Sequence, residues 1–218
     1  MTLERISQIF FFALEPDSSL AAEIEARKIN LRIAGGHQQY LDDPPHLTVY
    51  LAAFLDGDGL IDALSKIAVG LSAPCVRTTG WDLFTSDPLT GSTTLVTAID
   101  PVDKSRLRQL QANVIGHVAP MRNEASTTQR YAGVWEKLSA NRRRAIERDG
   151  FPYVGEDWQP HFTIASVAPA VWAKVWKKIG HDPIVGSGRC DAFVLYKIED
   201  EKPVEVARRH LPRPSSCE

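Results

Sequence analysis

The sequence has few of the residues and runs that define several protein classes. Its 218 residues include only three cysteines, Cys75, Cys190 and Cys217. An odd number of widely spaced cysteines argues against a disulfide framework, and the absence of a Cys-x-x-Cys pair argues against a zinc knuckle. Because this cysteine usage suits a reducing compartment, we expect a cytoplasmic protein.

Long apolar runs and an excess of basic charge are also missing. The apolar run at residues 9–14 is too short for a membrane span or for the apolar part of a signal peptide. The formal net charge is −2, whereas a duplex-binding surface needs clustered excess lysine and arginine. We therefore expect no membrane partner and no duplex DNA, although a neutral protein can still bind a small anion locally.

The rest of the composition is typical of a soluble globular protein. Hydrophobic residues make up 44% of the chain and charged residues 24%, which are ordinary values. A length of 218 residues suits one large domain or two closely packed lobes. We expect a monomer with a single bilobal domain over residues 1–211, followed by a disordered tail over residues 212–218.

A five-residue pattern occurs twice. Pro45-His46-Leu47-Thr48-Val49 and Pro160-His161-Phe162-Thr163-Ile164 both read Pro-His-apolar-Thr-apolar, and their histidines lie 161 − 46 = 115 residues apart. Because side chains alternate between the faces of a strand, each histidine shares a face with its threonine, and the apolar residues point into a core. One His-x-Thr is weak evidence, but the doubled pattern predicts a functional pair that faces one cleft.

The order of expected elements also repeats. Each half reads strand, acidic residue, proline, helix, connector, motif strand, helix and strand. Periodicity predicts strands at residues 9–14, 45–53, 75–84, 93–99, 160–167, 190–198 and 204–209, and helices at residues 18–33, 60–71, 107–118, 131–148 and 169–179. We therefore expect an α+β fold, namely a bilobal, duplicated α+β unit with pseudo-two-fold symmetry. Two antiparallel sheets would line a central cleft, with helices outside.

Two histidines that face one volume can divide acid–base work. The unperturbed pKa of histidine, ~6.5, lets it take or give a proton near neutral pH. Across a phosphorus atom, one neutral imidazole can take a proton from water or a hydroxyl, while a protonated imidazole gives one to the leaving oxygen. The hydroxyls of Thr48 and Thr163 can donate to phosphate oxygens. Two imidazoles and two hydroxyls are a poor zinc ligand set, so we expect no metal and no cofactor.

These paired motifs on a duplicated α+β chain resemble the two-histidine (2H) phosphoesterase superfamily, which includes 2′-5′ RNA ligase-like proteins and cyclic nucleotide phosphodiesterases. The resemblance extends from the first strand to the final hairpin. It implies metal-independent chemistry on 2′,3′-cyclic phosphates or 2′-5′ linkages of nucleotides and RNA ends. Carried over by motif, His46 and His161 would be the catalytic pair, and Thr48 and Thr163 would bind phosphate.

Two departures and two alternatives accompany this expectation. No glycine closely follows Val49, and Ser166 stands where the ligase-like branch often has arginine. The alternatives to a phosphodiesterase are a non-catalytic nucleotide- or RNA-binding protein that uses the same cleft, and a reversible 2′-5′ RNA ligase.

Four aromatic residues are candidates to stack on a base. Tyr40, Tyr153 and Trp158 precede the motif strands, although ordinary packing at the rim explains them as well. Tyr196 lies on the last long strand, and the resemblance implies that an aromatic from that region reaches the site.

Other residues are expected to have structural roles. Trp172 and Trp176 follow a helical stripe and are predicted to be core residues. The basic run at residues 141–144 predicts a solvated helix face rather than an RNA-binding patch. The histidines outside the motifs are expected at the surface or at helix ends, namely His37, His117, His181 and His210.

Overall fold

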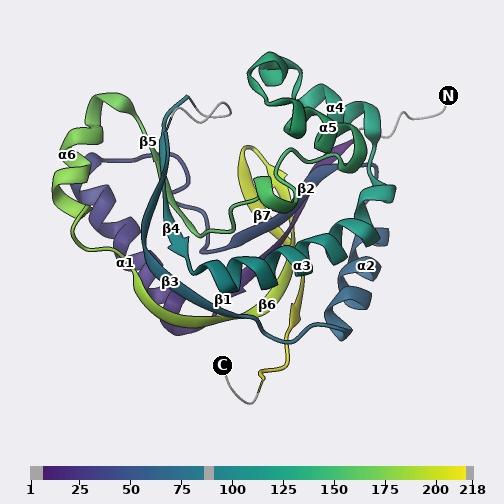
Figure 1. Ribbon diagram of the computed structural model, residues 1–218, viewed down its shortest axis with the longest axis horizontal. Helices are drawn as coiled ribbons and strands as arrows, with labels where there is room; N and C mark the ends of the chain where they lie inside the picture. The colour runs from purple at the N-terminus through teal and green to yellow at the C-terminus, as the bar shows by residue number, and fades with distance from the viewer. Residues whose placement is uncertain (1–6, 86–90, 215–218) are drawn as a thin grey trace.

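The structure is a computed structural model that describes residues 7–85 and 91–214 (Figure 1). Strands form where short apolar or β-branched runs lie between turn residues. They are β1 (Gln8–Pro16), β2 (Leu47–Phe54), β3 (Cys75–Phe84), β4 (Thr93–Ile99), β5 (Thr163–Val167), β6 (Val185–Glu199) and β7 (Lys202–His210).

In the described residues, seven strands form one antiparallel network. Its order is β2-β1-β6-β3-β4-β5, and β7 pairs with β6. Strand β6 is the link, because its residues 190–197 pair with β1 and its residues 185–189 pair with β3. The predicted antiparallel α+β class is therefore confirmed, with the two sheets sharing β6.

The pairing pattern is alike in the two halves. Strand β1 lies between β2 and β6, and β4 lies between β5 and β3. In each half a register shift skips the residue after the motif threonine, Val49 in β2 and Ile164 in β5. A duplicated unit would produce this pattern. The strand order shows that the two halves pair alike but does not show that they have the same geometry. The pseudo-two-fold symmetry therefore stays a prediction.

Acidic side chains start the first helix of each half. The Asp17 carboxylate accepts a hydrogen bond from the Leu20 N–H (3.0 Å), and Asp100 accepts one from the Val102 N–H (2.9 Å). The helices are α1 (Ser18–Gly35), α2 (Asp58–Val69), α3 (Pro101–Val118), α4 (Glu124–Arg130), α5 (Ala140–Asp149) and α6 (Pro169–Ile179), with 3-10 turns η1 (Ala119–Met121), η2 (Ala132–Lys137) and η3 (Gly155–Asp157).

The helices cover the outside of the strand network. Helix α1 packs against α6, and α2 packs against α3 (Figure 1). No helix within residues 7–85 and 91–214 combines the length and apolar character needed to cross a membrane.

The connector before the second motif differs from the prediction of one helix at residues 131–148. Instead α4, η2 and α5 follow one another. The Ser139 hydroxyl accepts a hydrogen bond from the Arg142 N–H (3.3 Å) and so begins α5 as a separate helix. A serine that bonds to the backbone in this way favours a new helix start over continuation.

The prediction that both tryptophans of α6 are core residues is wrong for Trp176. The rings of Trp172 and Trp176 stack with centroids 5.4 Å apart, Trp172 is half-buried, and Trp176 is 36% exposed. Val175 and Ile179 are buried instead, and Val175 lies directly against Gly35 of α1. The apolar stripe is thus wider than the face that α1 covers.

The C-terminal segment and the cysteines add two findings. The Pro212 carbonyl accepts a hydrogen bond from the Ala73 N–H (2.9 Å), and Arg213 bonds to Asp191 (3.2 Å). Residues 215–218 of the predicted disordered tail lie outside the described residues, so the domain boundary stays a prediction. Among the described cysteines, Cys190 is free and buried, whereas Cys75 is disulfide-bonded, which the odd cysteine count did not predict.

Candidate active site

Both motif histidines are held in the same way. His46 lies just before β2, and its Nδ1 is 2.8 Å from the Pro44 carbonyl oxygen. His161 lies two residues before β5 begins, and its Nδ1 is 2.6 Å from the Gln159 carbonyl oxygen. Because a carbonyl oxygen can only accept, each Nδ1 carries a proton. The lone pair of each neutral imidazole is therefore on Nε2.

The apolar residues of both motifs face the core, as the strand alternation predicts. Leu47 and Val49 of β2 are fully buried in the main hydrophobic cluster. Phe162 and Ile164 are buried in the same cluster. The two motifs are thus anchored in one continuous core, which fixes the position of one relative to the other.

The two histidines interact electrostatically. Burial is the main cause that lowers the pKa of His46 to about 4, and the charges of Lys28 and His161 act in the same direction. The hydrogen bond to Pro44 and the negative charge of Glu15 oppose this shift. At neutral pH, His46 is therefore a neutral imidazole, the form that accepts a proton.

The motif threonines lie at the start of their strands. Thr48 pairs with Ala13 of β1, and Thr163 pairs with Val96 of β4. Both threonines are half-buried, and a β-bulge follows each one. Bulges bend a strand and re-aim its side chains, and they are common beside active sites.

Aromatic and charged residues surround His46, and among them the sequence analysis named Tyr196 but missed Phe11, Glu15 and Arg208. The ring centroid of Phe11 is 5.2 Å from that of His46, and Tyr196 is 5.8 Å away. The Tyr196 hydroxyl donates to the Glu15 carboxylate, and Arg208 donates two further hydrogen bonds to it (2.6 and 2.7 Å). Burial and the bond to Glu15 raise the pKa of Tyr196, so its hydroxyl stays protonated.

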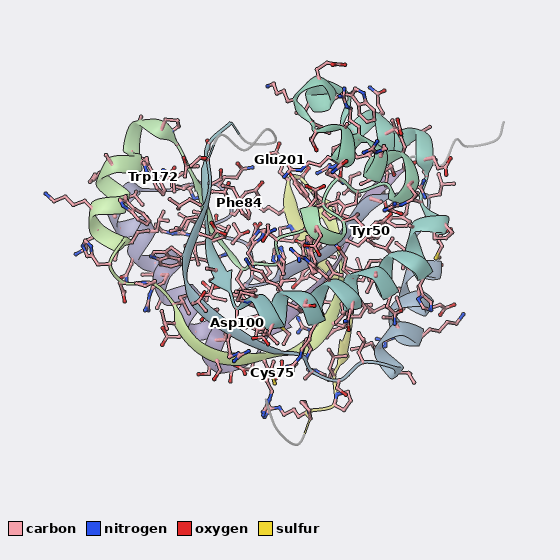
Figure 2. The ribbon with its side chains drawn as sticks, viewed as in Figure 1. Tyr50, Cys75, Phe84, Asp100, Trp172 and Glu201 are labelled. Atoms are coloured by element: carbon pink, nitrogen blue, oxygen red, sulfur yellow. The ribbon has the colours of Figure 1, made fainter. Side chains whose placement is uncertain are left out.

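Phe84 contacts the second histidine with its ring, as Phe11 contacts the first. Its ring meets the His161 ring edge to face, with centroids 4.8 Å apart. Figure 2 shows Phe84 on the side of β3 toward the middle of the molecule, away from Trp172. No local pattern marks this phenylalanine, because strand pairing alone brings the end of β3 beside the second motif.

The structure gives the predicted stacking residues different environments. Trp158 is 3% exposed and Tyr196 is 2% exposed, so packed side chains cover both rings. Tyr153 is half-buried, and the Arg142 guanidinium lies 5.0 Å above its ring. Tyr40 is half-buried in the loop before β2. Base stacking stays a prediction for Tyr40, and the burial of Trp158 and Tyr196 does not support it for those two.

The described residues contain no group of three or more histidine, cysteine, aspartate or glutamate side chains that could hold a metal ion. The remaining histidines are all exposed, as expected, namely His37, His117, His181 and His210.

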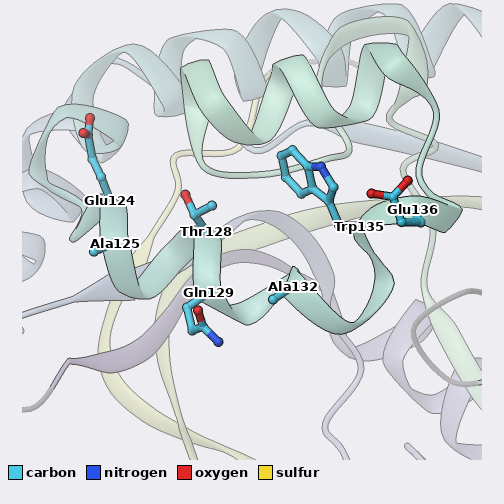
Figure 3. Close-up of a pocket in the computed structure, with 7 residues that line it drawn as sticks. All are labelled: Glu124, Ala125, Thr128, Gln129, Ala132, Trp135 and Glu136. Carbon is cyan, nitrogen blue, oxygen red and sulfur yellow. The ribbon is translucent and has the colours of Figure 1, made fainter.

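A surface pocket lies apart from the motif histidines. It is formed by α4 and η2 and has a volume of about 660 Å³ (Figure 3). Its lining residues are Glu124, Ala125, Thr128, Gln129, Ala132, Trp135 and Glu136. None of them belongs to either motif, so this pocket is separate from the candidate active site.

Solved structures share this fold at low sequence identity. The structure of Escherichia coli LigT complexed with 3′-AMP is 19% identical, covers 94% of this chain and 99% of its own, and has a TM-score of 0.52. TT0787 of Thermus thermophilus is 15% identical, with coverages of 94% and 98% and a TM-score of 0.55. A protein described as a phosphoesterase is 18% identical, with coverages of 95% and 100% and a TM-score of 0.52.

A search of curated proteins gives no match. A family model does match, over residues 16–202, and its description is the 2′-5′ RNA ligase superfamily. The matched range includes both Pro-His-apolar-Thr-apolar motifs and most of the strand network. The chain therefore belongs to the 2′-5′ RNA ligase superfamily.

Proposed function

We propose that this protein is a phosphodiesterase in which His46 and His161 form the acid–base pair. The observation that carries the proposal is the matched anchoring of the two imidazoles. Each donates a hydrogen bond from Nδ1–H to the carbonyl oxygen of the residue two positions earlier. This leaves Nε2 as the ring nitrogen that can exchange a proton with the substrate. A protein that only binds a nucleotide has no need for two imidazoles held in the same way.

Because burial lowers the pKa of His46 to about 4, we give it the role of general base in this proposal. Its neutral Nε2 takes a proton from the attacking water, whose oxygen forms a new bond to phosphorus. The bond from phosphorus to the leaving ribose oxygen breaks, and protonated His161 gives its Nε2 proton to that oxygen. Exchange with solvent then restores both protonation states. Each proton transfer is expected to contribute roughly 10²–10⁴-fold to the rate.

Thr48 and Thr163 are the proposed phosphate-binding residues. Each lies two residues after a histidine, at the start of a strand. Their hydroxyls would donate hydrogen bonds to the non-bridging oxygens, where negative charge grows during the reaction. These donors and the two imidazoles complete the chemistry without a metal ion, which is why we propose a metal-independent reaction.

The proposed substrates are nucleotides or RNA ends that carry a 2′,3′-cyclic phosphate or a 2′-5′ linkage. The family description, which names 2′-5′ RNA, supports this class, and one structural neighbour is complexed with 3′-AMP. We further propose that the protein acts in the cytoplasm as a monomer.

A chelator-treated hydrolysis panel tests the proposal. It offers 2′,3′-cyclic nucleotides, 2′-5′ dinucleotides and 3′-5′ dinucleotides to the wild type and to His161→Ala. We expect turnover of one of the first two classes in the presence of chelator, and its loss in the variant. Binding without turnover of any substrate by a folded protein would favour the non-catalytic alternative. Joined products in place of hydrolysed ones in the same assay would favour the ligase.

A further inference from the structure

Lys28 is an unusual residue for the interior of the protein. It lies on the buried face of α1 and is only 2% exposed. Its Nζ donates hydrogen bonds to the carbonyl oxygens of Tyr40 (3.0 Å) and Asp43 (2.5 Å). Burial lowers the pKa of Lys28, since an ammonium group loses hydration there. A buried lysine is costly, and an apolar side chain would fill the same space more cheaply.

The two carbonyls belong to the loop that joins α1 to β2. Tyr40 adopts a left-handed backbone conformation (φ 71°), which is strained for a residue with a side chain. Three residues after Asp43 comes His46, whose Nδ1 bonds to the Pro44 carbonyl. The lysine therefore holds the backbone immediately before the carbonyl that orients His46.

The same loop also contacts the second motif strand. The Gln39 carbonyl accepts a hydrogen bond from the Ser166 N–H of β5 (3.0 Å), and Gln38 Oε1 accepts one from the Ala168 N–H (3.0 Å). Figure 1 shows the segment after α1 passing β5 before it enters β2. Ser166 itself is buried and accepts a hydrogen bond from the Thr94 hydroxyl (3.1 Å). The loop thus connects the strand that follows His161 to the residues that lead into His46.

We propose that Lys28 is a positioning residue: it clamps the α1–β2 loop and so holds His46 in place relative to His161. The inference rests on the proposed function, because it assigns Lys28 to the same histidine pair. Lys28 acts through the backbone and touches no reacting atom.

The charges around His46 predict how its pKa changes when Lys28 or Glu15 is replaced. Lys28 and His161 both disfavour the protonated form of His46, whereas Glu15 favours it. Removal of the Lys28 charge should therefore raise the pKa of His46. Removal of the Glu15 charge should lower it further. The charged groups that act on Lys28 itself are Glu25, Asp42, Asp43 and Arg32.

The test compares Lys28→Met, Lys28→Arg and the control Lys66→Met, which changes an exposed lysine on α2. We expect Lys28→Met to lower kcat at least tenfold with KM changed less than threefold, because a misplaced base slows chemistry more than binding. The acidic limb of the rate profile should move to higher pH. Lys28→Arg keeps the charge but changes the geometry, so it should lower kcat while the limb stays in place.

A readout independent of activity separates this inference from the proposed function. The His46 imidazole is titrated by NMR in the wild type, Lys28→Met and Glu15→Gln, with shifts of opposite sign expected in the two variants. Wild-type kcat in folded Lys28→Met would overturn the inference even if the titration moves, because loss of the lysine charge can by itself shift the pKa of His46. If Lys28→Met does not fold, wild-type kcat in Lys28→Arg would overturn it. If the wild type turns over no substrate, the proposed function fails, and the titration still decides whether Lys28 acts on His46.

Discussion

At the scale of single residues, the backbone decides which nitrogen of each histidine is available. The carbonyl oxygen of Pro44 accepts a hydrogen bond from Nδ1 of His46, and the carbonyl oxygen of Gln159 accepts one from Nδ1 of His161. The residues that could be predicted from the sequence are those of the doubled motif. Phe84, Lys28 and the Glu15–Arg208 pair could not be predicted, because tertiary packing brings them to the histidines from distant positions in the chain.

The pKa of His46 sets one limb of the rate profile. The base must be unprotonated, so kcat/KM should fall as pH drops through about 4, the value for His46 in the free enzyme. The alkaline limb reports loss of the proton from the acid. Initial rates with a cyclic nucleotide between pH 3 and 9 measure both limbs. An acidic limb near the ordinary histidine value, ~6.5, would contradict the role given to His46.

The threonine hydroxyls are predicted to act on the phosphate. Thr48→Val and Thr163→Val keep the shape but remove the donor, so each should lower kcat/KM roughly 10- to 100-fold. Thr48→Ser and Thr163→Ser keep the hydroxyl and serve as matched controls, with much smaller losses. Equal kinetics for the valine and serine variants would show that the hydroxyl does not contact the phosphate.

At the scale of elements, the bulge in β2 depends on a buried glutamine. Gln111 of α3 is 1% exposed, and its Nε2 donates to the carbonyls of Val49 (3.0 Å) and Tyr153 (2.9 Å). Its Oε1 accepts from the Gly155 N–H (3.2 Å). One side chain therefore joins the bulged residue beside Thr48 to the connector that leads to the second motif.

Loss of that side chain should destabilise the fold. Gln111→Leu leaves buried carbonyl groups without donors, so the free energy of unfolding should fall by about 2–4 kcal/mol. Urea unfolding followed by circular dichroism measures the change. The control is Gln109→Leu, an exposed position on the same helix, which should stay within about 0.5 kcal/mol of the wild type. Equal effects of the two substitutions would refute the bridging role of Gln111.

The predicted bounds of helices and strands match the structure where the hydrophobic periodicity is strong. They differ where a local side-chain hydrogen bond determines where a helix begins. The strands at residues 75–84 and 93–99 have the predicted bounds. The connector helix was wrong because the Ser139 side chain starts a new helix there. The bulges at Val49 and Ile164 were not predicted, because a register shift depends on the partner strand and leaves no trace in the local pattern.

At the scale of the whole molecule, β6 makes the two halves dependent on each other. It pairs with β1 through one part and with β3 through the other. A chain that ends at residue 184 lacks this strand, so neither half completes its sheet. We expect that truncation to show no cooperative thermal transition, whereas the full chain should melt cooperatively. A cooperative transition in the shorter chain would show that the halves fold independently.

The central claim is that two histidines perform the chemistry as a pair. The most direct test is the hydrolysis rate of a 2′,3′-cyclic nucleotide with chelator present, for the wild type, His46→Ala and His161→Ala, each shown to be folded by circular dichroism. The account predicts metal-free turnover by the wild type and a loss of at least about 100-fold in each variant. A wild-type rate in either folded variant would contradict the account.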